Sequence, residues 1–151
     1  LNILFVCTGN TCRSPMAEAL FKSAAAEKNL DVSVKSAGLF APENGKASLY
    51  AVEALFEKNI ALNHTSSQLS EEKVEWADLV LTMTEQHKQL AVHEFSKSQD
   101  KIYTLKEYVN GDGGDIIDPF GGSLSDYQRT RDELEQLLRK LAEMLAKKSQ
   151  E

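Results

Sequence analysis

The apolar residues of this chain alternate between short continuous runs and longer stretches at helical spacing. Residues 2–6 form an apolar run that is too short for a buried helix and predicts an interior strand. A helical pattern follows Ser14-Pro15, a pair typical of a helix start, and a second strand is predicted to end at 36–38. Beyond these, the patterns predict helices at 49–56, 84–95 and 125–148 and strands at 79–83 and 101–105.

Strands that alternate with helices are typical of an α/β protein with a parallel sheet and right-handed crossovers. In such folds ligands bind at the carboxyl ends of the strands. No repeat, low-complexity segment or linker interrupts the pattern, and 151 residues suit one folding unit. We therefore expect residues 1–151 to form a single domain.

Composition narrows the classes of partner. A formal net charge of −6 argues against general nucleic-acid binding, which depends on Lys and Arg. No apolar run approaches the roughly 18 residues of a membrane helix. Two cysteines are too few for a secreted disulfide framework, and the start of the sequence has no signal-peptide pattern. These features predict a cytoplasmic protein that binds neither nucleic acid nor membrane.

The segment from Cys7 to Ser14 joins the first predicted strand to the first predicted helix. A glycine and an asparagine inside it tolerate left-handed backbone angles, so the loop amides can turn inward around a tetrahedral anion. Arg13 can grip two phosphate oxygens with its planar guanidinium. The sequence therefore predicts a phosphate-binding loop, whose five residues between Cys7 and Arg13 are Thr8, Gly9, Asn10, Thr11 and Cys12.

Cys7 is the candidate nucleophile of this loop. The same amides are expected to favour its thiolate and to lower its pKa from about 8.5 toward the range of roughly 3.5 to 7.5 of activated cysteines. Ser14 is placed to donate a hydrogen bond to that thiolate. Phosphoryl transfer also needs an acid and base, for which Asp118 is the candidate because Pro119 keeps its backbone extended and glycines precede the loop.

The string CTGNTCRSPMAEAL at 7–20 resembles the signature of the low-molecular-weight protein tyrosine phosphatase family. The likeness extends over essentially the whole chain, with SAG at 36–38, ALNHTS at 61–66 and DPFGGS at 118–123 in that family's order. The resemblance implies a flavodoxin-like three-layer α/β fold with a four-stranded parallel sheet flanked by helices. It also implies a cysteine-dependent phosphatase that needs no cofactor.

The resemblance assigns roles to further residues. It implies that Asp118 is the general acid and that a hydrogen-bond network supports the loop, formed by Asn10, Ser14, Ser36 and His64. Substrate contacts are expected from the loop residues Thr8, Gly9, Asn10, Thr11, Cys12 and Ser14 and from two aromatic walls, Phe40 and Phe120. No metal site is expected, because the three histidines lack ligand spacing; His87 and His93 are expected on a polar helix face with no function.

Two residues favour one branch of the family. Thr11 stands where the tyrosine-directed branch commonly has isoleucine, and Phe120 stands where that branch has a tyrosine. Both resemble the bacterial protein-arginine phosphatases. We therefore expect hydrolysis of phosphoarginine in proteins through a phosphocysteine intermediate, on substrates of a bacterial arginine kinase formed during stress, by a monomeric enzyme.

Three other functions compete with this interpretation. The first is a phosphotyrosine phosphatase. The second is an arsenate reductase on the same fold, which is disfavoured because no cysteine follows Cys12. The third is an inactive phosphate-binding module, which is disfavoured because Cys7, Arg13 and Asp118 are all present.

Cys12 is not needed for phosphoryl transfer. It could simply be a small residue that packs under the loop. The alternative is redox protection: a turned loop can bring two cysteines within disulfide range, so Cys12 would trap an oxidised Cys7 as a reversible disulfide.

Overall fold

The structure is a computed structural model that describes residues 1–149, so the last two residues of the predicted domain lie outside the described residues. In chain order the elements are β1 (Asn2–Cys7), α1 (Arg13–Glu27), β2 (Ser33–Gly38), α2 (Leu49–Phe56), α3 (Glu71–Trp76), β3 (Leu79–Thr82), α4 (Glu85–Glu94), a 3-10 helix (Ser96–Lys101), β4 (Ile102–Thr104), α5 (Leu105–Asn110) and α6 (Leu124–Ser149).

The four strands form one parallel sheet in the order β2-β1-β3-β4. The predicted α/β fold with a four-stranded parallel sheet flanked by helices is confirmed. The chain leaves β1 toward β2 on one side and then crosses to β3 on the other, so the order reverses beside β1. Ligands bind at such a reversal, beyond the carboxyl ends of the strands.

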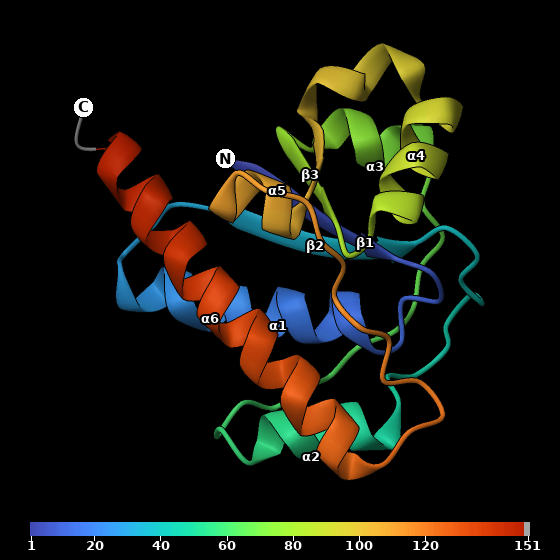
Figure 1. Ribbon diagram of the computed structural model, residues 1–151, viewed down its shortest axis with the longest axis vertical. Coiled ribbons are helices and arrows are strands. Elements are labelled where there is room, and N and C mark those ends of the chain that lie inside the picture. The colour runs from blue at the N-terminus through green and yellow to red at the C-terminus, as the bar shows by residue number, and fades with distance from the viewer. Residues whose placement is uncertain (150–151) are drawn as a thin grey trace.

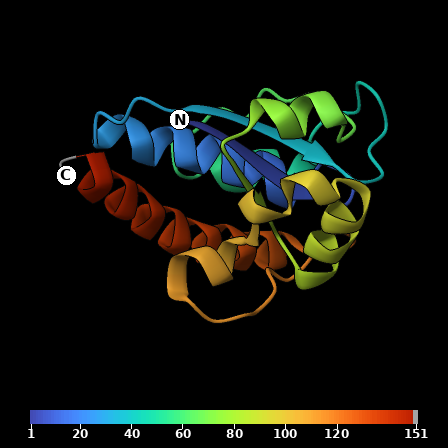
Figure 2. The ribbon, with the colours of Figure 1, turned by 90° about the horizontal axis from the view of Figure 1, so that it is seen from above.

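Helices cover both faces of the sheet (Figures 1 and 2). Alternate side chains of β1 enter two separate cores: Ile3 and Phe5 pack toward α1, α2 and α6, whereas Leu4 and Val6 pack toward α3 and α4. Every residue from 3 to 7 is buried, which explains the continuous apolar run of this strand. The sheet is therefore the middle of three layers, and β1 is held rigidly at its centre.

The structure differs from the predicted elements at its short helices. The sequence pattern did not reveal α3 or α5, because six residues span too few turns to show a periodicity. Their ends carry the recognisable signal instead: Thr104 and Glu107 form a capping box at the start of α5. In α2, Leu49 and Phe56 are exposed rather than part of the buried face, which is formed by Ala51, Ala54 and Leu55.

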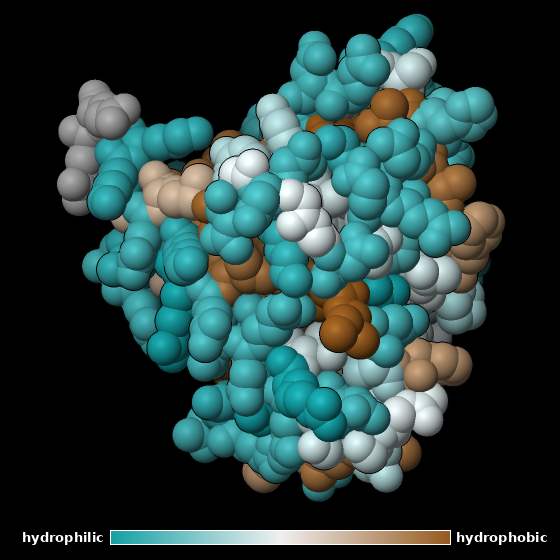
Figure 3. All heavy atoms as spheres, in the orientation of Figure 1, coloured by the Kyte–Doolittle hydropathy of each residue, from teal (hydrophilic) through white to brown (hydrophobic). Residues whose placement is uncertain are grey.

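The visible surface is largely hydrophilic, with apolar residues in small separate groups (Figure 3). Within residues 1–149, no helix has the length and apolar character needed to cross a membrane.

Candidate active site

A cavity of about 180 Å³ lies where β1 leads through the 8–12 loop into α1. Its walls come from the loop and from the segment that precedes α6, two parts of the chain that the fold brings together. The lining residues are Cys7, Thr8, Gly9, Thr11, Cys12, Arg13, Asp118 and Phe120. The predicted nucleophile, arginine and acid therefore share one cavity.

The loop takes its shape from Asn10. Asn10 is fully buried with a φ of 55°, in the left-handed region that asparagine tolerates better than most residues. Gly38, at the end of β2, lies directly against the loop, and a Cβ there would be 2.5 Å from the carbonyl oxygen of Thr8. Only glycine allows this close approach, so the SAG motif places the sheet under the loop.

A chain of hydrogen bonds links the buried asparagine to the cysteine. The Asn10 Nδ2 group donates to the Ser14 Oγ at 2.8 Å and to the Ser36 Oγ at 3.0 Å. Ser36 in turn donates to Glu18 Oε1 at 2.6 Å. Because the Ser14 oxygen accepts from Asn10, its own proton is free to point toward the Cys7 Sγ, 2.9 Å away.

Two more contacts fix the backbone of the same loop. The His64 Nε2 lies 2.8 Å from the carbonyl oxygen of Asn10, and the Ser67 N–H donates to the Asn10 Oδ1 at 2.9 Å. The structure thus brings all four predicted support residues together. Sequence reasoning missed Glu18 and Ser67, which complete the network.

The environment of Cys7 differs from the sequence prediction. Burial raises the pKa of the Cys7 thiol, while the hydrogen bond from Ser14 and the charge of Arg13 act in the opposite direction. The prediction of a lowered pKa is therefore wrong for this structure. The sequence pattern showed the groups that stabilise the thiolate but not the depth at which β1 buries the sulfur.

Arg13 is buried, and its guanidinium is held at two points. Its Nη1 donates to the carbonyl oxygen of Ile116 at 2.9 Å, and its Nη2 lies 3.5 Å from the Asp118 Oδ2. The guanidinium therefore faces the cavity in a fixed orientation and connects the 8–12 loop to the segment that carries Asp118.

The segment around Asp118 is attached to Met83, the residue that directly follows β3, and to α6. The Ile116 N–H donates to the carbonyl oxygen of Met83 at 2.9 Å, and Thr130 donates to the carbonyl oxygen of Ile117 at 3.3 Å. The carboxylate itself is about half exposed, and its Oδ1 accepts the Phe120 N–H at 3.1 Å. These contacts hold one carboxylate at the cavity mouth, on the side opposite the loop.

The two predicted aromatic walls lie in different places. Phe120 lines the cavity together with Thr11, although its ring is 74% exposed. Phe40 is 72% exposed and is absent from the cavity lining. Its backbone N–H donates to the carbonyl oxygen of Thr8 at 2.9 Å, so Phe40 lies beside the loop while its ring projects outward.

Cys12 lies on the α6 side of the cavity. Both Cys12 and Cys7 are free thiols. The Cys12 Sγ is 3.4 Å from the hydroxyl oxygen of Tyr127 and 3.3 Å from that of Ser48. Burial and the neighbouring Cys12 raise the pKa of Tyr127 to about 12, so the Tyr127 hydroxyl keeps its proton at neutral pH.

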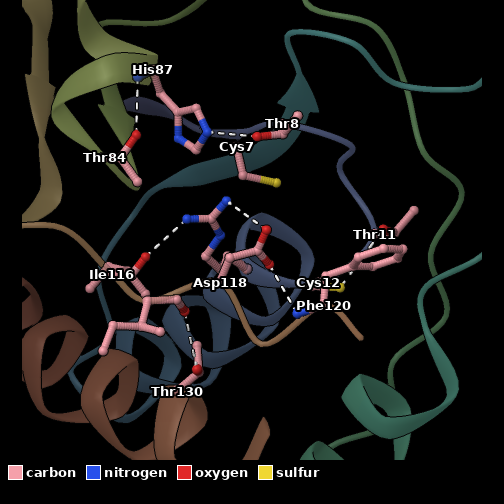
Figure 4. A network of polar contacts seen from close by, with 12 residues as sticks. Cys7, Thr8, Thr11, Cys12, Thr84, His87, Ile116, Asp118, Phe120 and Thr130 are labelled. Carbon is pink, nitrogen blue, oxygen red and sulfur yellow. Dashed lines mark hydrogen bonds and ion pairs between the residues drawn. The ribbon is translucent and has the colours of Figure 1, made fainter. Parts of the chain in front are cut away.

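His87 corrects a further prediction, because it is buried rather than on a polar helix face. Its Nε2 lies 2.8 Å from the Thr8 Oγ1 (Figure 4). Burial and the nearby Arg13 lower the pKa of His87 to about 4, so the ring is neutral at physiological pH. His93, by contrast, is exposed as expected. Within residues 1–149, no cluster of His, Cys, Asp and Glu has the arrangement needed to hold a metal ion.

A parallel α/β sheet that ends in a cysteine-arginine phosphate loop, with an aspartate across the cavity, defines a cysteine-dependent phosphatase site. Residues 2–151 match the family described as low molecular weight phosphotyrosine protein phosphatase. The chain belongs to this family, and the predicted resemblance is confirmed.

Two relatives are named for a more specific activity. The chain is 65% identical to a protein-arginine-phosphatase of Bacillus subtilis, over 97% of this chain and 98% of the relative. It is 43% identical to PtpB, a low molecular weight protein-tyrosine-phosphatase of Staphylococcus haemolyticus, over 93% of this chain and 97% of the relative. Among solved structures, the YwlE arginine phosphatase C7S mutant with a phosphorylated active-site serine superposes with a TM-score of 0.95 at 64% identity, covering 96% of this chain and 95% of that one.

Proposed function

We propose that this protein is a protein-arginine phosphatase, which hydrolyses phosphoarginine in proteins through a phosphocysteine intermediate. One observation carries the proposal: Cys7, Thr11, Arg13 and Asp118 line a single small cavity. A relative named protein-arginine-phosphatase at 65% identity supports the choice of substrate. The phosphorylated active-site serine of the structurally similar C7S mutant supports a covalent intermediate at position 7.

In the first step, the Cys7 thiolate attacks phosphorus in line with the P–N bond. An S–P bond forms, and the electron pair of the P–N bond passes to the guanidine nitrogen as it leaves. The loop amides and Arg13 stabilise the charge on the equatorial oxygens. Asp118, whose side chain lies at the cavity mouth and is about half exposed, donates its proton to the departing nitrogen, and the carboxylate that results pairs with the planar guanidinium.

In the second step, water hydrolyses the phosphocysteine. Asp118 accepts a proton from the water, the oxygen bonds to phosphorus, and the S–P bond breaks. Inorganic phosphate leaves and Cys7 returns to its thiolate, which the Ser14 hydroxyl stabilises from 2.9 Å.

Selectivity for phosphoarginine is assigned to Thr11. Its hydroxyl offers a polar partner near the P–N bond, where isoleucine would present only apolar bulk. Thr11 lines the cavity, and its backbone oxygen accepts the Ser48 N–H at 2.9 Å, which holds its backbone in place. The competing function, a phosphotyrosine phosphatase, is supported by the name of the 43% identical relative.

The substrates are assigned to proteins phosphorylated by a bacterial arginine kinase. The acidic chain, with a net charge of −6, favours recognition of the modified side chain itself over recognition of an acidic peptide. The stress setting, the cytoplasmic location and the monomeric state stay predictions.

A redox role for Cys7 and Cys12 is part of the proposal. Peroxide oxidises the Cys7 thiolate to sulfenic acid and is itself reduced to water. The Cys12 sulfur then attacks the Cys7 sulfur, so that a disulfide forms and water leaves, and a thiol reductant later restores both thiols. The position of both cysteines on one cavity supports this sequence.

Trapping the intermediate tests the enzyme mechanism. Acid quenching during turnover of a phosphoarginine peptide is expected to show one phosphate on Cys7 by mass spectrometry. Asp118→Asn is expected to slow both steps, whereas Asp112→Asn, in the preceding loop, is a matched control with little effect. A Cys7→Ser protein that retained full turnover would contradict the mechanism.

A further inference from the structure

His87 reaches the active site from an element to which the mechanism assigns no role. It lies in the first turn of α4, where its backbone N–H donates to the Thr84 Oγ1 at 3.1 Å. Its ring points toward the phosphate loop, and the Nε2 lies 2.8 Å from the Thr8 Oγ1 (Figure 4). Thr8 directly follows Cys7 and lines the same cavity.

The other ring nitrogen decides the direction of this hydrogen bond. The Nδ1 of His87 is buried and has no hydrogen-bond partner among residues 1–149. An N–H group left without an acceptor in such a place is more costly and rarer than an unused lone pair. The neutral ring therefore carries its proton on Nε2, and this N–H donates a hydrogen bond to the Thr8 Oγ1.

The ring stays neutral in its surroundings. Its burial and the Arg13 guanidinium lower the pKa of His87 to about 4, against smaller opposing effects of Asp115 and Asp118. A neutral ring with one proton donates at Nε2 only. Thr8 then uses its oxygen as an acceptor toward His87, so its own hydroxyl proton is available to another group.

We propose that His87 is a positioning residue, which orients the Thr8 hydroxyl as a hydrogen-bond donor to a phosphoryl oxygen in the cavity. The inference rests on the proposed function, since it takes the cavity to be the phosphoryl site. Thr8 adds one donor to those of the loop amides and Arg13, and His87 ensures that this donor faces the anion. The 2.8 Å contact between the His87 Nε2 and the Thr8 Oγ1 is the link through which His87 can set the direction of the Thr8 hydroxyl.

The tautomer can be measured on the unaltered protein. In ¹⁵N-detected NMR of the imidazole groups, we expect the His87 Nε2 to carry the proton and Nδ1 to be bare, with no titration between pH 6 and 7. A proton on Nδ1 would overturn the proposal, because the Thr8 hydroxyl would then donate its hydrogen bond to the ring and not to the phosphoryl group.

The affinity for inorganic phosphate tests the consequence. Thr8→Val is expected to weaken phosphate binding about tenfold, as expected for the loss of one hydrogen bond to a charged group. His87→Leu should weaken phosphate binding by the same factor as Thr8→Val. His87→Gln should retain most of the phosphate affinity, because its amide can donate from nearly the same position. His93→Gln, an exposed histidine on the same helix, is the matched control.

The double variant separates positioning from packing. If His87 acts through Thr8, then His87→Leu should cost no further phosphate affinity in the Thr8→Val protein. If His87→Leu weakened phosphate binding equally in the unaltered protein and in the Thr8→Val protein, His87 would act only through packing. That result would overturn the proposal. Phosphate affinity does not depend on which phosphorylated residue is the substrate, so failure of the arginine assignment would leave this result unaffected.

Discussion

The hydroxyl oxygen of Ser14 lies 2.9 Å from the sulfur of Cys7 while it accepts a hydrogen bond from the side chain of Asn10. These two contacts direct the Ser14 proton to the sulfur. Ser14 is fully buried, so no water competes for that position. The pKa of Cys7 is therefore a balance in which burial raises it and the Ser14 hydrogen bond lowers it.

Removal of this hydroxyl shifts the balance toward the thiol. We expect Ser14→Ala to raise the pKa of Cys7 further and to slow phosphatase activity at pH 7 about tenfold, because a hydrogen bond to a charged sulfur is lost. The pH dependence of Cys7 alkylation measures the pKa directly. Ser23→Ala, elsewhere on α1, should leave it unchanged, and an unshifted alkylation profile in Ser14→Ala would contradict the account.

His87 gives the folded protein a specific sensitivity to acid. Its pKa falls from 6.5 to about 4 on folding, so between these values the unfolded chain binds a proton that the folded chain does not. Stability is therefore lost as the pH falls through this window. We expect a loss of about 2 kcal/mol from His87 between pH 7 and pH 4.5, because this range covers most of the interval between the two pKa values.

Urea unfolding of the unaltered protein and of His87→Gln at both pH values measures this contribution. The glutamine cannot titrate, so its stability should depend less on pH over this range. Equal pH dependence of the two proteins would show that folding does not change the pKa of His87 and would contradict this account.

Cys12 is expected to protect Cys7 from irreversible oxidation. After brief exposure to peroxide, the unaltered protein should lose activity and recover it on addition of a thiol reductant. Cys12→Ser should lose activity under the same treatment and recover only in part, because the sulfenic acid of Cys7 has no neighbouring thiol to trap it. Full recovery of Cys12→Ser would show that Cys12 has no such role.

The core of the site could be predicted because its residues are close in sequence. Cys7 and Arg13 belong to one loop between a buried strand and a helix, and local backbone rules are enough to indicate an anion site there. Asp118 could be placed opposite them only through the family resemblance. Its position depends on contacts of Ile116 with Met83, just after β3, and with Arg13, which no local pattern encodes.

His87 and Glu18 could not be predicted for the same reason. Both lie on helices. His87 contacts the loop directly at Thr8, whereas Glu18 reaches Asn10 through Ser36, and these contacts depend on how the helices pack against the sheet. The fold places α4 directly after β3, the neighbour of β1, so a polar residue in its first turn lies near the phosphate loop. That placement distinguishes His87 from His93, which lies about 1.7 turns further along the same helix and is exposed.

The choice of substrate is the central claim, and a paired assay tests it most directly. The same peptide carrying either phosphoarginine or phosphotyrosine should be hydrolysed side by side, with kcat/KM measured for both. We expect at least a hundredfold preference for phosphoarginine, and Thr11→Ile should shift the ratio toward phosphotyrosine by about tenfold or more, because the polar partner near the P–N bond is lost. A strong preference of the unaltered protein for phosphotyrosine would contradict the claim.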